Sequence, residues 1–262
     1  MKKFTLILSA AALSLGAFSS CDSVDESDRY ITVEKQEAKR VVLIEEFTGM
    51  SCTNCPTGHE IVHNLLELYP ESVIPVSIHS GPPEYTLDPT HRLVLDTPAG
   101  QEYYKSVGSP ALPAAVINKQ TPVLQPTNWA TEVARLITIP TPLSMSANAS
   151  LSSDGKTVDI NVSMSSVDNV NGKLQVWVLE NDIVGYQLDH GTHVFDYVHN
   201  HVLRAVVNGL WGEEMSISQN VPTQISYTQA MEQNWVPENT YIVAFVYDDK
   251  GVVQATQCKI DL

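Results

Sequence analysis

Two cysteines separated by two residues form the strongest chemical motif of the chain, Cys52-Thr53-Asn54-Cys55. The motif follows an apolar run at 41–44 and precedes a helical pattern of apolar residues at 61–69. We therefore expect it between a buried strand and the start of a helix. Unpaired N–H groups and partial positive charge at a helix start stabilise a thiolate. Cys52 is accordingly the predicted nucleophile, the more exposed thiol at the helix start, and Cys55 the shielded thiol that resolves a mixed disulfide.

A structural disulfide is the alternative for this cysteine pair. A disulfide that closes a loop of only four residues restricts the unfolded chain less than one that closes a long loop. It would therefore contribute little to stability, and the spacing favours a redox role for Cys52 and Cys55. Another cysteine, Cys258, lies in the last apolar segment and is expected to behave as a small buried hydrophobe.

A second motif, His59-Glu60-Ile61-Val62-His63, has the spacing of a zinc protease helix. No third ligand follows at a familiar spacing, so we interpret His59 and His63 as residues at the border of the helix's apolar face. Cys52, Cys55, His59 and His63 fall within about 60° of one another on a helical wheel. Two thiolates and imidazoles suit Cu(I) or Zn, which leaves a copper-handling protein as an alternative.

Further histidines lie close together later in the chain: His190, His193, His199 and His201. Because side chains alternate along a strand, His199 and His201 would face the same side and could chelate a metal with His190 or Asp196. The more ordinary expectation is that they form hydrogen bonds at the edge of a sheet. We predict no bound metal and no cofactor, with His59, His63, His199 and His201 as the weak metal candidates.

The first twenty residues have the pattern of a secretory signal. Lys2 and Lys3 precede an uncharged apolar run at 4–18, which is too short to span a bilayer. Small residues directly before Cys21 resemble a bacterial lipobox, so residues 1–20 are predicted to be removed and Cys21 to be acylated. Residues 21–37 hold four acidic residues at 22–28 and are expected to form a flexible tether.

The charge balance excludes one large class of partner. The chain has 15 basic and 30 acidic residues, and removal of Lys2 and Lys3 with the signal gives 13 − 30 = −17. Phosphate contacts require Lys and Arg, so nucleic acids are not expected as partners. No internal segment reaches the roughly 20 apolar residues that a membrane-spanning helix requires. Membrane association is therefore expected only through the lipid anchor.

Two domains are expected to follow the tether. In residues 38–140, apolar strands at 41–44, 73–78 and 114–117 alternate with helices at 61–69, 91–95, 99–107 and 127–137, a pattern typical of an α/β layered sheet. In residues 141–262 the predicted elements are strands only, at 143–151, 157–164, 174–179, 201–207, 224–228, 241–247 and 252–260. Short strands with turn residues between them predict an antiparallel β-sandwich of the immunoglobulin type, with Trp177 and Trp211 in its core.

The strand, dithiol and helix of the first domain resemble the thioredoxin fold. The resemblance implies a thioredoxin-like domain with a cis-proline before a later strand, packed against the dithiol. Pro113, in Leu112-Pro113-Ala114, matches that position, and Pro110 is the alternative. Pro113 is thus a candidate catalytic-site residue that shapes a substrate groove.

Three further runs resemble the outer membrane protein 28 family, lipoproteins of the Bacteroidota. They are Glu45-Glu46-Phe47-Thr48-Gly49, Asn54-Cys55-Pro56, and Tyr197-Val198-His199-Asn200-His201 with Arg204 after it. The resemblance covers nearly the whole mature chain. It implies an outer membrane lipoprotein, facing the periplasm or the surface, with a thioredoxin-like head.

Two functions are consistent with these features. The first is a lipid-anchored thiol–disulfide oxidoreductase, whose partners are protein thiols or disulfides. The second is a non-catalytic module at the outer membrane, in which the head serves as a scaffold for binding. The fold alone does not decide between them, because function depends on the site.

Overall fold

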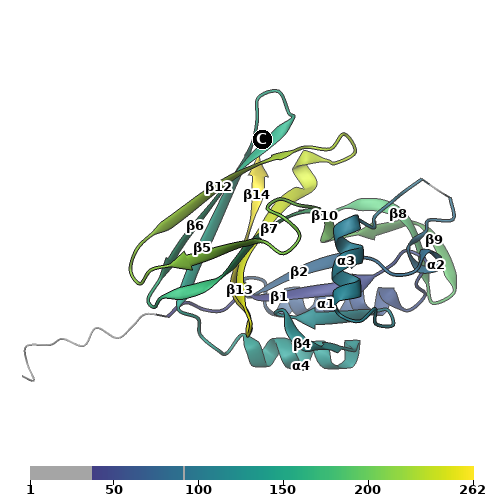
Figure 1. The fold of residues 1–262 in the computed structure, drawn as a ribbon. Helices are drawn as coiled ribbons and strands as arrows, with labels where there is room; N and C mark the ends of the chain where they lie inside the picture. The colour runs from purple at the N-terminus through teal and green to yellow at the C-terminus, as the bar shows by residue number, and fades with distance from the viewer. Residues whose placement is uncertain (1–36, 91) are drawn as a thin grey trace, which may run out of the picture. The chain divides into compact units, whose positions relative to one another are not determined.

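The structure is a computed structural model that describes residues 37–90 and 92–262 (Figure 1). The predicted signal, Cys21 and all but the end of the predicted tether lie outside the described residues. The described chain forms one compact unit. Among its helices, none is long and apolar enough to cross a membrane.

The first half of the described chain contains four strands and four helices. β1 and β2 run parallel and are joined by α1, whereas β3 runs antiparallel to β1 and pairs with β4. The element bounds are β1 Val42–Thr48, α1 Cys55–Leu68, β2 Val73–His79, α2 Pro83–Thr86, α3 Pro98–Ser106, β3 Ala114–Ile117, β4 Gln120–Leu124 and α4 Pro126–Leu136. β1 and β2 are buried along their whole length, as expected for parallel strands covered on both faces.

The second half is built almost entirely of strands. Their bounds are β5 Leu143–Leu151, β6 Thr157–Ser166, β7 Val170–Glu180, β8 Ile183–Asp189, β9 Thr192–His199, β10 Val202–Val206, β11 Glu213–Ile217, β12 Thr223–Ala230, β13 Thr240–Asp248 and β14 Gly251–Asp261, with a short 3-10 helix at Pro237–Asn239. β8 and β9 form a separate two-stranded hairpin, which lies beside the helical half in Figure 1. This hairpin carries several of the sequence-predicted site residues.

The predicted fold class, a thioredoxin-like α/β domain followed by an all-β antiparallel sandwich, is wrong. The strands of both halves form one mixed 12-stranded sheet, in the order β12-β6-β5-β14-β13-β7-β10-β2-β1-β3-β4, with β11 on β7. β10 makes the connection, because Val202 pairs in parallel with Ser77 of β2 and antiparallel with Glu180 of β7. Without β10, the edge of β2 would present unpaired backbone groups. Hydrophobic pattern identifies a strand but not its neighbour, so the sequence did not reveal this junction.

The buried core also crosses from one half to the other. One cluster joins Leu43 and Phe47 of β1 with Trp177 of β7 and Phe245 of β13. A second cluster lies among β5, β6, β7 and β13, and a third packs α1 and α4 on the other face of β1 and β2. Trp177 is buried as predicted, but Trp211 is 42% exposed, so its prediction as a core residue is wrong.

Most predicted elements are present, with two kinds of error. No helix forms at residues 92–95, where one was predicted. β4, β8, β9 and β11 were not predicted, because their residues are largely polar or exposed and lack a continuous apolar face. The missed hairpin β8–β9 matters most, because it covers the site described next.

Candidate functional site

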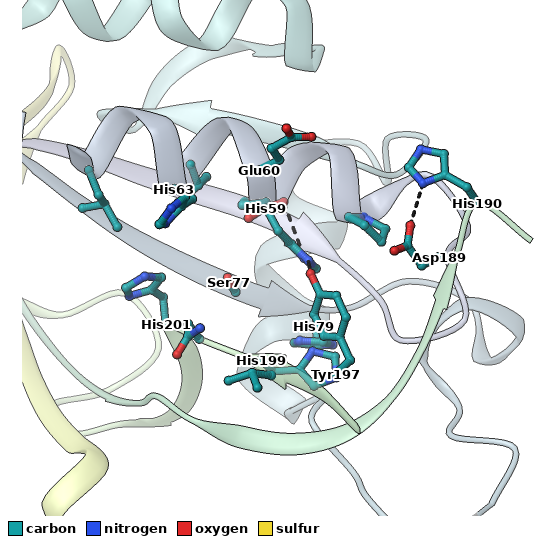
Figure 2. Close-up of a pocket in the computed structure, with 16 residues that line it drawn as sticks. His59, Glu60, His63, Ser77, His79, Asp189, His190, Tyr197, His199 and His201 are labelled. Atoms are coloured by element: carbon teal, nitrogen blue, oxygen red, sulfur yellow. Dashed lines mark hydrogen bonds and ion pairs between the residues drawn. The ribbon is translucent and has the colours of Figure 1, made fainter. Parts of the chain in front are cut away.

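A pocket of about 540 Å³ opens between α1, β2 and the end of β9 (Figure 2). Its lining includes six of the chain's eight histidines: His59, His63, His79, His190, His199 and His201. The structure therefore brings all four of the weak metal candidates together. His79 was not recognised from the sequence.

The inner wall of this pocket is formed by polar residues of two otherwise apolar strands. Glu46 of β1 lies opposite Ser77 of β2, and Thr48 lies opposite His79. Residues paired across a sheet and two apart along a strand share one face, so these four side chains lie together on one face of the sheet. The sequence signal for this wall is the alternation of polar residues with apolar ones inside two buried strands.

His199 and His201 are held by different hydrogen bonds. His199 Nε2 lies 3.0 Å from the carbonyl oxygen of Tyr186, and His201 Nδ1 lies 2.8 Å from the hydroxyl of Tyr241. Burial lowers the pKa of both histidines to about 4, so both are neutral at physiological pH. The expectation that they face the same side of one strand is wrong. β9 ends at His199, and His201 has φ 59°, so the chain turns between them.

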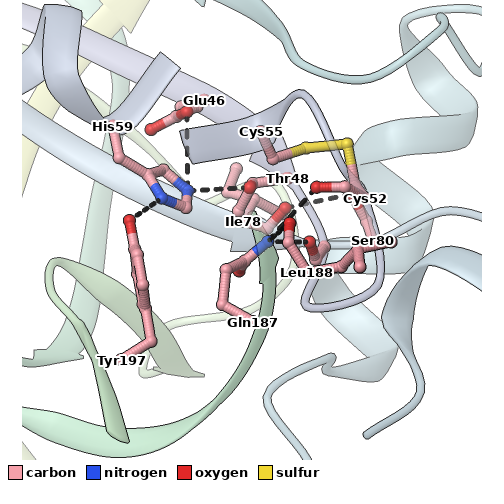
Figure 3. Close-up of polar contacts among 11 residues, drawn as sticks. Glu46, Thr48, Cys52, Cys55, His59, Ile78, Ser80, Gln187, Leu188 and Tyr197 are labelled. Atoms are coloured by element: carbon pink, nitrogen blue, oxygen red, sulfur yellow. Dashed lines mark hydrogen bonds and ion pairs between the residues drawn. A yellow bond between two sulfur atoms is a disulfide. The ribbon is translucent and has the colours of Figure 1, made fainter. Parts of the chain in front are cut away.

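His59 connects α1 to β1 and β9 (Figure 3). Its Nε2 lies 2.9 Å from Thr48 Oγ1, and its Nδ1 lies 2.7 Å from the hydroxyl of Tyr197. Glu46 Oε1 is 3.8 Å from Nε2 of the same ring. Burial lowers the pKa of His59 to about 3 and raises that of Glu46 to about 8. At neutral pH both groups are uncharged, so their proximity is not an ion pair.

Cys52 and Cys55 form a disulfide at the start of α1 (Figure 3). The motif lies at the start of the helix, as the sequence predicted, with Asn54 as the N-cap and Pro56 in the first turn. Cys55 is fully buried and Cys52 is 3% exposed. Cys52 is the more exposed of the two, as predicted, but other parts of the chain cover both residues.

The hairpin β8–β9 provides much of that cover. The Leu188 N–H donates to Met50 O at 2.7 Å, and the His190 N–H donates to Thr53 O at 3.0 Å. The buried side chain of Gln187 donates from Nε2 to Gly49 O at 3.3 Å and to Cys52 O at 3.2 Å (Figure 3). These bonds join the hairpin to four successive parts of the loop around the disulfide, at Gly49, Met50, Cys52 and Thr53.

The loop that contains α2 closes the opposite side of the disulfide. The Ser51 N–H donates to Tyr85 O at 2.8 Å, and the Ser51 hydroxyl donates to Leu87 O at 2.6 Å. A Cβ at Gly49 would clash with the carbonyl of Tyr85, so this approach requires glycine. The Cys52–Cys55 loop is thus held between two segments remote in sequence.

The remaining predicted residues lie apart from the pocket. The Leu112–Pro113 peptide bond is cis, as predicted, and it precedes β3, which pairs with β1 from Phe47. Cys258 in β14 is half-buried, and burial raises the pKa of its thiol to about 11. The predicted copper ligand set is not assembled, because Cys52 and Cys55 are bonded to each other and His59 is hydrogen-bonded at both ring nitrogens.

The fold and site define a β-rich protein with a buried disulfide beside an open histidine pocket. A family model described as "Outer membrane protein Omp28" matches residues 100–262. The chain belongs to the Omp28 family of outer membrane proteins. The match confirms the family resemblance noted in the sequence, but it does not include the disulfide at 52–55.

Three solved structures are similar to the chain, and the first two share its fold. HBP35 of Porphyromonas gingivalis has a TM-score of 0.67 at 15% identity, covering 85% of this chain and 76% of its own. Protein AGR_C_4864 from Agrobacterium tumefaciens has a TM-score of 0.53 at 14% identity, covering 85% and 95%. A domain of the outer membrane lipoprotein Omp28 from Porphyromonas gingivalis is 28% identical, with a TM-score of 0.33, covering 46% and 89%. No curated protein matches the chain.

Proposed function

We propose that this outer membrane lipoprotein is a non-catalytic binding module whose ligand site is the histidine pocket. One contrast carries the proposal: the disulfide is sealed beneath β8–β9, whereas the adjacent pocket is open and lined mainly by histidines and other hydrogen-bonding side chains. A volume of about 540 Å³ lies within the range of small-molecule sites, about 300–1,000 Å³.

Thiol–disulfide exchange requires a substrate thiolate to reach one sulfur of the disulfide directly. Cys52 and Cys55 are both buried, and hydrogen bonds from two remote segments hold the loop that contains them. A protein substrate therefore has no access while the hairpin is in place. This geometry supports a structural role for the disulfide, in which it fixes the start of α1 beside the pocket.

Thiol–disulfide exchange with protein thiols or disulfides is the second candidate function. The observation in its favour is the position of the disulfide at the start of α1, where a helix favours a thiolate after reduction. In that case Cys52 would attack and Cys55 would resolve, and β8–β9 would have to move before each turnover.

The two candidates are separated by a turnover assay on the folded chain. Reduction of a protein disulfide by a small dithiol is measured with wild type and with Cys52→Ala. We expect equal rates for both, at the uncatalysed background. A wild-type rate clearly above background that is lost in Cys52→Ala would overturn the binding-module proposal and establish the second candidate.

Lipid attachment at Cys21 is the proposed means of anchoring. Cys21→Ser is expected to leave an unacylated precursor that partitions into the aqueous phase of a detergent extraction. Wild type provides the control and partitions into the detergent phase. Unchanged partitioning of the variant would contradict acylation at this residue.

A further inference from the structure

The two ring nitrogens of His199 are not equivalent. Nε2 faces the carbonyl oxygen of Tyr186, which can only accept, so this nitrogen carries the proton. In the neutral ring the lone pair is therefore on Nδ1. His199 is 2% exposed, and its Nδ1 is buried without a hydrogen-bond partner. A buried lone pair without a donor is costly, unless an ion or molecule in the pocket binds it.

His79 presents a second buried ring nitrogen. It is also 2% exposed, and its Nδ1 is buried without a hydrogen-bond partner among the described residues. The His79 and His199 rings lie edge to face with centroids 5.3 Å apart. The hydrogen bond from His199 to a backbone carbonyl is the arrangement that orients histidines which bind metals.

The charges around the pocket favour a cation over an anion. Among the described residues, its lining includes the carboxyl groups of Glu60 and Asp189 and no Lys or Arg, and the one cation that acts on His79 is Arg204, which pairs with Glu180. Neutral imidazole suits zinc, copper and nickel, whereas magnesium and calcium prefer oxygen ligands. The chemistry therefore indicates a divalent transition-metal ion.

We propose that His79 and His199 bind a divalent transition-metal ion in the histidine pocket. The inference rests on the proposed binding function and names its ligand class. Within the described part of the chain, no three His, Cys, Asp or Glu side chains are already arranged around one ion. Two protein ligands leave coordination positions for water or a bound molecule, as in open rather than structural sites. The sequence-based expectation of no metal did not consider His79.

Zn²⁺ is the appropriate probe, because it has no redox chemistry with the disulfide. Calorimetric titration of the folded, oxidised chain at pH 7.5 is expected to show one Zn²⁺ per chain. His79→Gln and His199→Gln should each weaken binding at least tenfold. Glutamine at 199 can still donate to Tyr186 O but offers no ring nitrogen. His193→Gln is the matched control, because His193 lies on the same strand but does not line the pocket.

The ring nitrogens of the wild-type chain provide a second readout, which does not depend on the folding of any variant. On addition of Zn²⁺, the ¹⁵N resonance of His199 Nδ1 is expected to shift, while Nε2 keeps its proton. The absence of saturable binding by wild type, or binding unchanged in both variants, would overturn the metal site. That result leaves the binding-module proposal standing if the turnover assay shows no catalysis, whereas catalysis would overturn that proposal whatever the zinc result.

Discussion

The hairpin β8–β9 has two ends with opposite chemistry. At its turn, backbone and side-chain groups hydrogen-bond to the Cys52–Cys55 loop, and the disulfide is closed to solvent. At its other end, His199 lines an open pocket with one ring nitrogen unsatisfied. A recognisable motif therefore need not mark the functional site. In this chain the open, incompletely satisfied region is the better candidate, because buried polar groups are normally paired.

Removal of the Gln187 side chain is expected to have the largest effect on stability and on the closure of the disulfide. Gln187→Leu deletes the two bonds from Nε2 to the carbonyls of Gly49 and Cys52. Each such hydrogen bond contributes about 0.5–1.5 kcal/mol, so the loss of both should lower the free energy of unfolding by about 1–3 kcal/mol. We also expect dithiothreitol to reduce the disulfide at least tenfold faster, measured by quenching with a maleimide. The control is Gln219→Leu, which removes an exposed hydrogen bond from Gln219 Nε2 to Val167 O in the β-rich half.

The buried carboxyl group of Glu46 gives a pH-dependent test. Its pKa in the folded chain, about 8, is above the ordinary value of 4.5. Between these values the unfolded chain has lost the proton that the folded chain retains, so stability falls as pH rises. His59, His79, His199 and His201 have the opposite effect, which fades as pH rises above their ordinary value of 6.5. The histidine contribution is common to wild type and to a Glu46 variant, so the difference between their slopes from pH 6.5 to 8 isolates Glu46.

Glu46→Gln is expected to remove the contribution of Glu46 to this pH dependence. That contribution lowers the free energy of unfolding by up to about 2 kcal/mol between pH 6.5 and 8. Glu60→Gln, at an exposed position on α1, is the matched control and should leave the slope unchanged. An equal slope in wild type and Glu46→Gln would show that Glu46 is ionised in the folded chain. The description of the pocket wall as uncharged would then be wrong.

Tyr197→Phe is a smaller perturbation that tests the attachment of β9 to α1. It removes the hydroxyl 2.7 Å from His59 Nδ1 and keeps the ring. The expected loss is about 0.5–1.5 kcal/mol in chemical denaturation. Disulfide reduction should keep its wild-type rate, since the turn of the hairpin is untouched. Faster reduction would show that the two ends of β8–β9 move together.

Phe195→Ser is expected to have the smallest effect. Phe195 lies on β9 with its side chain 60% exposed. Exposed substitutions away from special features usually change stability by less than about 0.5 kcal/mol. A loss well above that range in a thermal melt would indicate that Phe195 contributes to the cover over the disulfide. Zinc affinity measured alongside should be unchanged.

The sequence predicted local structure better than spatial arrangement. The disulfide motif was correctly placed at the start of α1, and most strands of the β-rich half were found from their apolar alternation. Pairing of β10 with β2 and β7 was not predicted, because strand neighbours depend on distant parts of the chain. The burial of both cysteines was not predicted either, since β8 and β9 have weak strand patterns and their cover was not foreseen.

The same distinction applies within the pocket. His59, His63, His199 and His201 stood out because they occur in short motifs. His79 did not, because a single histidine at the end of an apolar strand carries no spacing signal. Its pairing with His199 arises only when β9 folds over β2.

Lys119, at the turn between β3 and β4, shows how firmly the two halves are joined. Its ammonium group is 2.8 Å from Glu45 of β1 and 5.3 Å from the centres of the Trp177 and Tyr247 rings. One cation thus interacts with β1, β7 and β13 together. The chain should consequently melt in a single cooperative transition, with no intermediate in which one half has unfolded. The fluorescence of Trp177 would then change at the temperature at which the Cys52–Cys55 region and the β-rich half both unfold.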